Sequence, residues 1–308
     1  MMATDSAQAT ARRATGRSSG GGRPPLSGRA RYDLVRRRVL QVLAWIPLLL
    51  LVLWTMIPFL VTLGISFKSR GEVFADPGLL PNDPTLGAYG EVLARPGFRA
   101  TLLNSVLVGL GTTALTLAIS MPAAYAFARF RFAGRHLLLL FTLLPRLVPS
   151  LGLMVPLYRI AVALGALDRR LTLIVVYTGM LVPLAVWLLV GFYQRIPREL
   201  EEAANVDGCN LFKRMRYIVI PLSVPALITI GVLAFREAWN EFTLVLVLTT
   251  TPGKRTLPYE LFTMQGIEGI PNFPAEAAFA LLTVLPFIFV YMRIERYVVS
   301  GITSGAVK

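Results

Sequence analysis

The sequence holds few of the side chains on which metal centres, disulfides and catalytic triads depend. It has one cysteine, Cys209, and one histidine, His136, among 308 residues. A single cysteine cannot form an intrachain disulfide, and this pair is too small a set for the usual Cys- and His-based metal sites. The lone histidine lies beside Arg135 at the edge of an apolar run, which is typical of a boundary residue. We therefore predict no catalytic residue, no metal site and no cofactor bound by this chain.

Charged residues are also scarce. They make up 16% of the chain, whereas a globular domain has about 25%, and apolar residues make up 55%. The mean hydropathy is +0.62. So few charges cannot cover a water-facing surface, which indicates a membrane protein. The net charge of +14 does not point to nucleic acid, because the basic residues lie between apolar runs and not over one soluble face.

Six apolar segments approach or exceed the roughly 20 residues that a helix needs to cross a bilayer. The first is longer than the core of a signal peptide, which has about 7–15 residues, so we interpret it as a retained span. The sequence thus predicts an all-α polytopic membrane protein with six transmembrane helices. The spans are expected at residues 39–67, 102–128, 137–158, 171–193, 217–248 and 277–298.

The fifth segment is too long for one upright helix. It contains Arg236, Glu237 and Glu241, so we expect a break, a strong tilt or an exit from the lipid there. The pairs Arg236/Asn240 and Glu237/Glu241 are four residues apart and are predicted to share helix faces. Ionisable residues at membrane depth usually face a cavity or a neighbouring helix. Candidates for lining a translocation path are Arg236, Glu237, Trp239, Asn240 and Glu241; an internal ion pair and an interfacial tryptophan are the structural alternative.

Two further groups in the spans have structural interpretations. Arg146 lies between Pro145 and Pro149, and its guanidinium is expected to satisfy backbone carbonyls that these prolines free. Gly109 and Gly111, with the Thr112-Thr113 pair, are predicted to allow close helix packing.

The distribution of basic residues predicts the orientation. Nine arginines precede the first span in a Gly-, Ser- and Pro-containing segment, so residues 1–35 are predicted to be a disordered basic cytoplasmic tail; a transit peptide is the alternative. With the amino terminus inside, 20 of the 31 basic residues lie on the inner side and nine on the outer side. This bias places both termini in the cytoplasm, although nearly half of the inner total comes from the tail.

The inner segment between the fourth and fifth spans is more than a turn. After Pro197, acidic residues and alanines predict a short helix, with Pro in its first turn and acids near the positive end of its dipole. Gly208 suits a helix stop in the left-handed conformation. The Ala203-Ala204 face is predicted to be exposed and small enough for a partner to approach closely.

This segment resembles the EAA signature of binding-protein-dependent ABC importer permeases. Glu202-Ala203-Ala204, three residues, Gly208, nine residues and then Ile218 to Pro221 follow that signature in both spacings. Ile220 stands where Leu is usual and Cys209 where a small Ala is common. Residues 237–242 and 299–308 are similar to the shorter, six-helix partner of the maltose-type carbohydrate permeases.

The resemblance implies a type I ABC importer permease fold over residues 36–308, in the inner membrane of a bacterium. It implies four kinds of partner: a homologous permease, two cytoplasmic ATPases that bind ATP and Mg, an extracytoplasmic solute-binding protein and lipid. The helices at about 198–213, called here the coupling loop, would dock on an ATPase. The residues implied in docking are Glu202, Ala203, Ala204, Asp207, Gly208, Leu211 and Phe212.

The expected function is that of a non-catalytic membrane subunit of an ATP-driven sugar importer. The sequence has no G-x-x-x-x-G-K-[ST] string, so ATP hydrolysis is expected in a separate chain. An ion-coupled secondary transporter is the alternative, and a helix resting on lipid headgroups is the alternative for the coupling loop. The outer segments 68–100 and 249–275 are expected to contact the binding protein.

Overall fold

The computed structural model describes residues 28–264 and 271–303, and within these ranges every regular element is a helix. The predicted all-α class is therefore confirmed. The chain divides into two compact units, residues 1–58 and 59–308. The first helix, α1 (Gly28–Ser66), begins in the first unit and ends in the second.

Helix α1 begins earlier than the sequence predicts. It starts at Gly28, within the segment 1–35 that was expected to be a tail. Between Gly28 and Pro47 no further glycine or proline interrupts the chain, and arginine and leucine are good helix formers. From Trp45 to Ser66 the helix is strongly apolar. A helix of this composition suits the hydrocarbon core of a membrane.

Three long helices form the centre of the second unit. They are α4 (Phe98–Arg129), α7 (Arg170–Tyr193) and α10 (Ile220–Asn240). Helix α4 packs most extensively against α7 and next against α10. Apolar clusters fill the spaces between the helices, with Tyr193 and Phe279 among their fully buried side chains.

Two glycines let α4 approach both neighbours. A Cβ on Gly109 would lie 2.7 Å from Cε2 of Phe235 in α10, and one on Gly111 would lie 2.6 Å from Cδ1 of Ile174 in α7. The predicted close packing at these glycines is confirmed. The hydroxyl of Thr113 donates to the carbonyl of Gly109 at 2.8 Å, so it adds no exposed polar group to the contact.

The range predicted as the third span is sharply bent. It is divided into α5 (Arg135–Leu143), a 3-10 turn η1 (Leu144–Leu147) and α6 (Ser150–Ala163), and the two arms differ in direction by 92°. Proline at 145 and 149 explains the bend, because proline lacks the amide hydrogen that would continue the helix.

The coupling loop comprises α8 (Arg198–Val206) and α9 (Leu211–Arg214). The fifth segment follows it, beginning within a π-helical turn η2 (Met215–Val219) that leads directly into α10. Helix α10 ends at Asn240, and α11 (Thr243–Leu248) follows after two non-helical residues. The expected break therefore lies at residues 241–242.

The break overturns one predicted helix face. Glu241 lies beyond the end of α10, so it does not share a face with Glu237. Instead its carboxylate accepts hydrogen bonds from the backbone amides of Leu244, at 3.1 Å, and Val245, at 3.3 Å. These amides belong to the first turn of α11 and have no partner within that helix. The Glu241 carboxylate therefore caps the N-terminus of α11.

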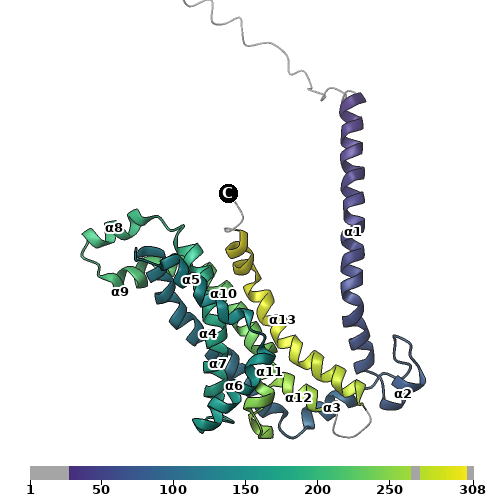
Figure 1. The fold of residues 1–308 in the computed structure, drawn as a ribbon. Coiled ribbons are helices and arrows are strands. Elements are labelled where there is room, and N and C mark those ends of the chain that lie inside the picture. The colour runs from purple at the N-terminus through teal and green to yellow at the C-terminus, as the bar shows by residue number, and fades with distance from the viewer. Residues whose placement is uncertain (1–27, 265–270, 304–308) are drawn as a thin grey trace, which may run out of the picture. The chain divides into compact units, whose positions relative to one another are not determined.

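The remaining elements are α2 (Arg70–Ala75), α3 (Gly87–Ala94), η3 (Pro252–Lys254), α12 (Leu257–Met264) and α13 (Phe273–Thr303). Helices α8 and α9 lie at one end of the second unit, and α3 and α12 lie at the other (Figure 1). In the part of the chain that the structure describes, four helices are long and apolar enough to cross a membrane, or five if the bent pair counts as one span. The sixth predicted span falls within α13, whose Phe273–Leu285 part is apolar but shorter. The tail residues 1–27 and 304–308 lie outside the described ranges.

The close contact at Gly109 makes a stability prediction. Gly109→Val should lower the stability by about 1–3 kcal/mol, because its side chain would overlap the ring of Phe235. The matched control is Gly179→Ala in α7, where an added Cβ meets nothing within 4 Å and alanine favours the helix. Thermal melting in detergent checks both variants. Equal melting temperatures for Gly109→Val and the wild type would contradict the packing.

Candidate functional site

The coupling loop is built from two capped helices. Helix α8 follows Pro197 and carries Glu199 and Glu201 in its first turn, where the helix dipole favours acids. At its other end the amide of Gly208 donates to the carbonyl of Asn205 at 3.1 Å, and the amide of Cys209 donates to the carbonyl of Ala204 at 2.9 Å. These two bonds form a Schellman motif.

The predicted left-handed stop at Gly208 is confirmed, because its φ is +79°. A side chain at this position would be strained in that conformation. The chain then restarts at once, since the side chain of Asn210 accepts a hydrogen bond from the amide of Lys213 and caps α9. The glycine therefore fixes the angle between α8 and α9.

The two faces of the coupling loop differ in exposure. Ala204 is only 8% exposed, so the prediction of an open Ala203-Ala204 face is wrong for Ala204, which lies against the bundle. Its helix position, three residues after the buried Glu201, explains this. Val206 and Phe212, in contrast, are 88% and 71% exposed. The outward residues are Glu202, Ala203, Val206, Asp207, Gly208, Leu211 and Phe212.

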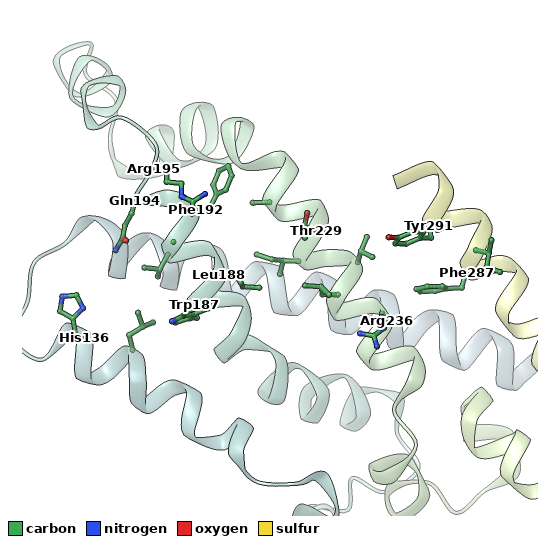
Figure 2. A pocket seen from close by; sticks show the side chains of 18 residues that line it. His136, Trp187, Leu188, Phe192, Gln194, Arg195, Thr229, Arg236, Phe287 and Tyr291 are labelled. Atoms are coloured by element: carbon green, nitrogen blue, oxygen red, sulfur yellow. The ribbon is translucent and has the colours of Figure 1, made fainter. Parts of the chain in front are cut away.

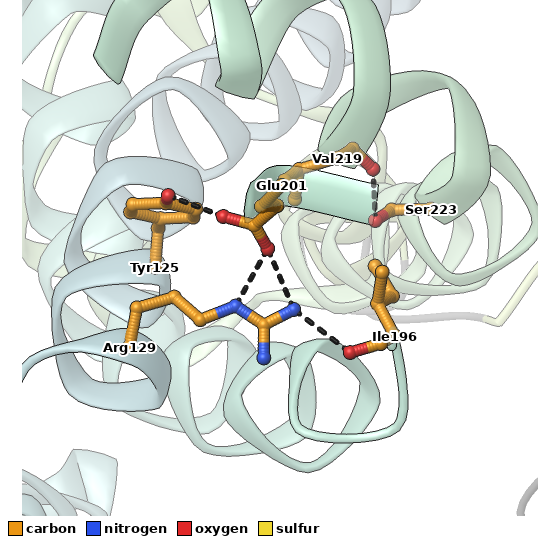
Figure 3. A network of polar contacts seen from close by, with 6 residues as sticks. All are labelled: Tyr125, Arg129, Ile196, Glu201, Val219 and Ser223. Carbon is orange, nitrogen blue, oxygen red and sulfur yellow. Dashed lines mark hydrogen bonds and ion pairs between the residues drawn. The ribbon is translucent and has the colours of Figure 1, made fainter. Parts of the chain in front are cut away.

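A buried ion pair attaches α8 to α4. The Oε1 atom of Glu201 lies 2.7 Å from both Nε and Nη2 of Arg129, and its Oε2 accepts a hydrogen bond from the hydroxyl of Tyr125 at 2.5 Å. Arg129 also donates to the carbonyl of Ile196 at 3.0 Å, just before α8 begins. Figure 3 shows the guanidinium reaching both acceptors. The side chains of Arg129 and Glu201 are only 10% and 7% exposed.

Sequence reasoning missed Glu201, although it chose the neighbouring Glu202. The partners of Glu201 are more than 70 residues away in the chain, so no local spacing indicates them. The available signal was helix periodicity: Glu201 and Ala204 are three apart and share the inward face.

A large cavity lies beside the bundle. It has a volume of about 1060 Å³ and is bounded by residues of α5, α7, α10 and α13. Figure 2 shows Trp187 and Thr229 towards its middle, with Arg236 on α10 and Tyr291 on α13 on one side. Most of its wall is aliphatic or aromatic, so a solute that enters meets few polar side chains.

The cavity contains one of the five predicted path residues. Arg236 lines it, and its Nη1 atom lies 3.3 Å from a carboxylate oxygen of Glu237. The side-chain amide of Asn240 donates to the carbonyl of Arg236, as their predicted shared face allows. Trp239 is only 8% exposed and packs against Phe235. The structure thus keeps Arg236, Glu237 and Asn240 together and separates Trp239 from this group.

Arg146 differs from its expected contact. Its Nη1 atom donates to the carbonyl of Met180 in α7 at 3.4 Å, so the acceptor belongs to a neighbouring helix and not to the prolines beside it. The bend at η1 explains the difference, because it carries Arg146 out of the direction of α5. Arg146 therefore binds a backbone carbonyl, as predicted, but this hydrogen bond links η1 to α7.

At the opposite end of the unit, polar side chains hold the segment after α11. Asn104, which is fully buried, donates to the carbonyls of Gly253 and Arg255 and accepts from Nε of Arg170. The carboxylate of Asp168 accepts hydrogen bonds from the amides and hydroxyls of Thr250 and Thr251. Part of the predicted outer segment 249–275 is therefore fixed to the bundle, while residues 265–270 lie outside the described ranges.

The hydrogen bonds at Asp168 determine its acidity. Burial alone would raise the pKa of this carboxyl, but the bonds from Thr250 and Thr251 outweigh it and lower the pKa to about 2. These bonds favour the charged form, because all four donors point at the carboxylate. The ionised group therefore stabilises the folded state.

The apolar spans, the exposed helix pair at one end and the largely apolar cavity define an all-helical, polytopic membrane protein of the transport class. No group of three or more metal-binding side chains occurs in the described part of the chain. The chain belongs to the family of binding-protein-dependent transport system inner membrane components, whose model matches residues 117–304. It is thus an ABC importer permease of the inner membrane.

Named relatives match more than four fifths of the chain. The sulfoquinovosyl glycerol transport system permease protein SmoH of Agrobacterium fabrum is 36% identical, over 82% of this chain and 88% of its own length. The trehalose/maltose transport system permease protein MalG of Thermococcus litoralis is 32% identical, over 89% of this chain and 99% of its own. A solved bacterial ABC transporter, involved in the import of the acidic polysaccharide alginate, has a chain with a TM-score of 0.75 and 23% identity over 89% of this chain and 99% of its own. That structure supports the type I permease fold.

The buried ion pair predicts that replacing its arginine lowers the stability far more than replacing the arginine of an exposed pair. Arg129→Met should lower the free energy of unfolding by about 3–5 kcal/mol, because it leaves the Glu201 carboxylate buried without its counter-charge. Arg129→Met/Glu201→Gln should recover part of that loss. The matched control is Arg70→Met, which breaks a half-exposed pair with Glu91 and should cost less than about 1 kcal/mol. Unfolding titrations in mixed micelles measure all three, and equal costs for the two single variants would contradict the burial argument.

The lowered pKa of Asp168 predicts a pH dependence. Its stabilisation is fully present above the ordinary value of 3.8 and is lost as the pH falls towards 2. The difference in melting temperature between the wild type and Asp168→Asn should therefore be constant from about pH 5 to 7 and shrink as the pH falls through about 3. The exposed Asp83→Asn serves as a control. A difference that is the same at pH 3 and pH 7 would contradict the role assigned to these hydrogen bonds.

Proposed function

We propose that this chain is a membrane-spanning, non-catalytic permease subunit of an ATP-driven sugar importer, and that its coupling loop docks on a cytoplasmic ATPase. The observation that carries the proposal is the apolar outward surface of this loop. Val206 and Phe212 are largely exposed there, beside the carboxylate of Glu202. Exposed aliphatic and aromatic side chains on a short, well-capped helix pair suit a protein partner.

The ion pair gives this docking a mechanical consequence. Glu201 is held by Arg129, and Arg129 also holds the backbone at Ile196, so α8 is fixed to the end of α4. A displacement of α8 by an ATPase is therefore passed to α4 and to the helices packed on it. ATP and Mg bind the partner ATPase, and this chain supplies the joint and part of the path.

The orientation follows from the basic residues. The end that carries the coupling loop also carries Arg195, Arg198 and Lys213, together with Arg129 at the end of α4. Cytoplasmic segments are enriched in lysine and arginine. We place this end, and both termini, on the cytoplasmic side.

Sugars are the proposed cargo because relatives of this chain are named for them. These names include trehalose/maltose and sulfoquinovosyl glycerol transport systems. A second solved alginate transporter is in complex with a periplasmic protein that binds an alginate pentasaccharide; its chain matches with a TM-score of 0.62. By analogy, the outer segments at α3 and α12 are proposed to contact a solute-binding protein. Helix α1, which is strongly apolar from Trp45 to Ser66, is proposed to contact a homologous permease or lipid. No observation favours an ion-coupled transporter, since Glu241 caps α11.

Replacing an outward residue of the coupling loop tests the proposal. Val206→Glu should reduce copurification of the ATPase at least about tenfold, because a charge would enter an apolar contact, while the melting temperature stays unchanged. Phe212→Glu should act alike. The matched control is Leu80→Glu, since Leu80 is 75% exposed at the other end of the unit and should leave copurification unchanged. Normal ATPase copurification with both loop variants would contradict the docking surface.

A further inference from the structure

The charged side chains around the cavity are all potential cations. His136, Arg195 and Arg236 line it, and no aspartate or glutamate is among its lining residues. Figure 2 shows Arg195 near the coupling-loop end of the cavity and Arg236 well separated from it. A low-dielectric wall with charges of one sign raises the local concentration of solutes of the opposite sign.

Of these three residues, Arg236 is the one whose position in the membrane requires an explanation. It lies 16 residues after the start of α10, which is about 24 Å along the helix axis, and only four residues before its end. Enrichment of arginine on the cytoplasmic side therefore explains Arg195 but not Arg236. An arginine in an apolar span that faces a cavity is by default a candidate functional group.

The partner of Arg236 leaves much of its binding capacity free. Glu237 is the neighbouring residue, and the pair shares one hydrogen bond of 3.3 Å, with side chains 56% and 48% exposed. Such half-exposed pairs are weak. A carboxylate in the cavity can take two parallel hydrogen bonds from a guanidinium, which is a stronger arrangement than this single contact.

The rest of the wall suits a sugar ring. Trp187, Phe287 and Tyr291 line the cavity, and Thr229 adds a hydroxyl. Aromatic faces pack against the apolar C–H faces of pyranose rings, while an arginine reads a carboxylate or sulfonate substituent. The wall of one cavity therefore offers both aromatic faces for a sugar ring and an arginine for an anionic substituent on that ring.

We propose that this cavity is a segment of the translocation path that favours anionic saccharides, with Arg236 as the residue that determines the preference for charge. The solute class is a sugar that bears a carboxylate, sulfonate or phosphate group. The inference rests on the proposed importer function and adds the charge of its cargo. Glu237 moderates the attraction, because it competes for the same guanidinium.

A thiol-protection experiment on the assembled importer tests this. The chain carries Cys209→Ala and Thr229→Cys, is purified with its partner subunits and is placed in phosphatidylcholine nanodiscs. A neutral methanethiosulfonate labels the new thiol, and D-glucuronate or D-glucose is added as the protecting solute. These two sugars share a ring and differ at C6, so their comparison isolates the charge.

The expected half-protecting concentration of glucuronate is at least about tenfold below that of glucose, as a charge-assisted hydrogen bond implies. Arg236→Gln should remove the difference, and Arg236→Lys should keep part of it. Glu237→Gln should strengthen protection by glucuronate about two- to fivefold, because it releases the guanidinium. Opposite effects from these two neighbouring substitutions are not expected of a merely structural role.

Three outcomes would overturn the inference: equal protection by both sugars, an unchanged preference in Arg236→Gln, or a thiol that is not labelled in the assembled importer. A second set of discs contains phosphatidylglycerol. Displacement of glucuronate there would be a fourth contrary outcome, because lipid would then be the anion at this site. ATPase copurification is measured on the same samples. If it persists while the charge preference is absent, the importer proposal stands and only the anionic cargo is rejected.

Discussion

The carboxylate of Glu201 is buried at the C-terminal end of α4, and such a charge is tolerated only where it is paired and hydrogen-bonded. Arg129 supplies the counter-charge and Tyr125 a further donor, both from one helix. The position of α8 is therefore not free to vary, since moving it away from α4 would strand a buried charge. The outward surface of the coupling loop depends on this constraint.

The same central helix is fixed at its other end by neutral and charged polar groups. Asn104 of α4 holds the segment after α11, and Asp168 holds the same segment from the turn before α7. Between these ends, Gly109 and Gly111 bring α10 and α7 close. Helix α4 thus links the joint with α8, the packed centre and the segment after α11, while the cavity lies beside α7, α10 and α13.

Local signals in the sequence were enough for the helical class, the apolar segments, the left-handed Gly208 and the packing glycines. Each depends on residues near one another in the chain, such as a hydrophobic run or a glycine after a helix. The ion pair of Glu201, the burial of Ala204 and the acceptor of Arg146 depend on distant partners, which no spacing indicates. The capping role of Glu241 was missed for a different reason: a break was expected in this segment but its position was not, so Glu237 and Glu241 were assigned to one helix.

The central claim is that α8 and α4 move as one body when the ATPases act. Double electron–electron resonance between spin labels at Glu199 in α8 and Ile119 in α4, with Cys209→Ala, measures it in the assembled importer with and without ATP. A rigid joint between α8 and α4 should give one narrow distance distribution that is the same in both states, and a broadened one in Arg129→Met. A distance that changes with ATP while the ion pair is intact would contradict it.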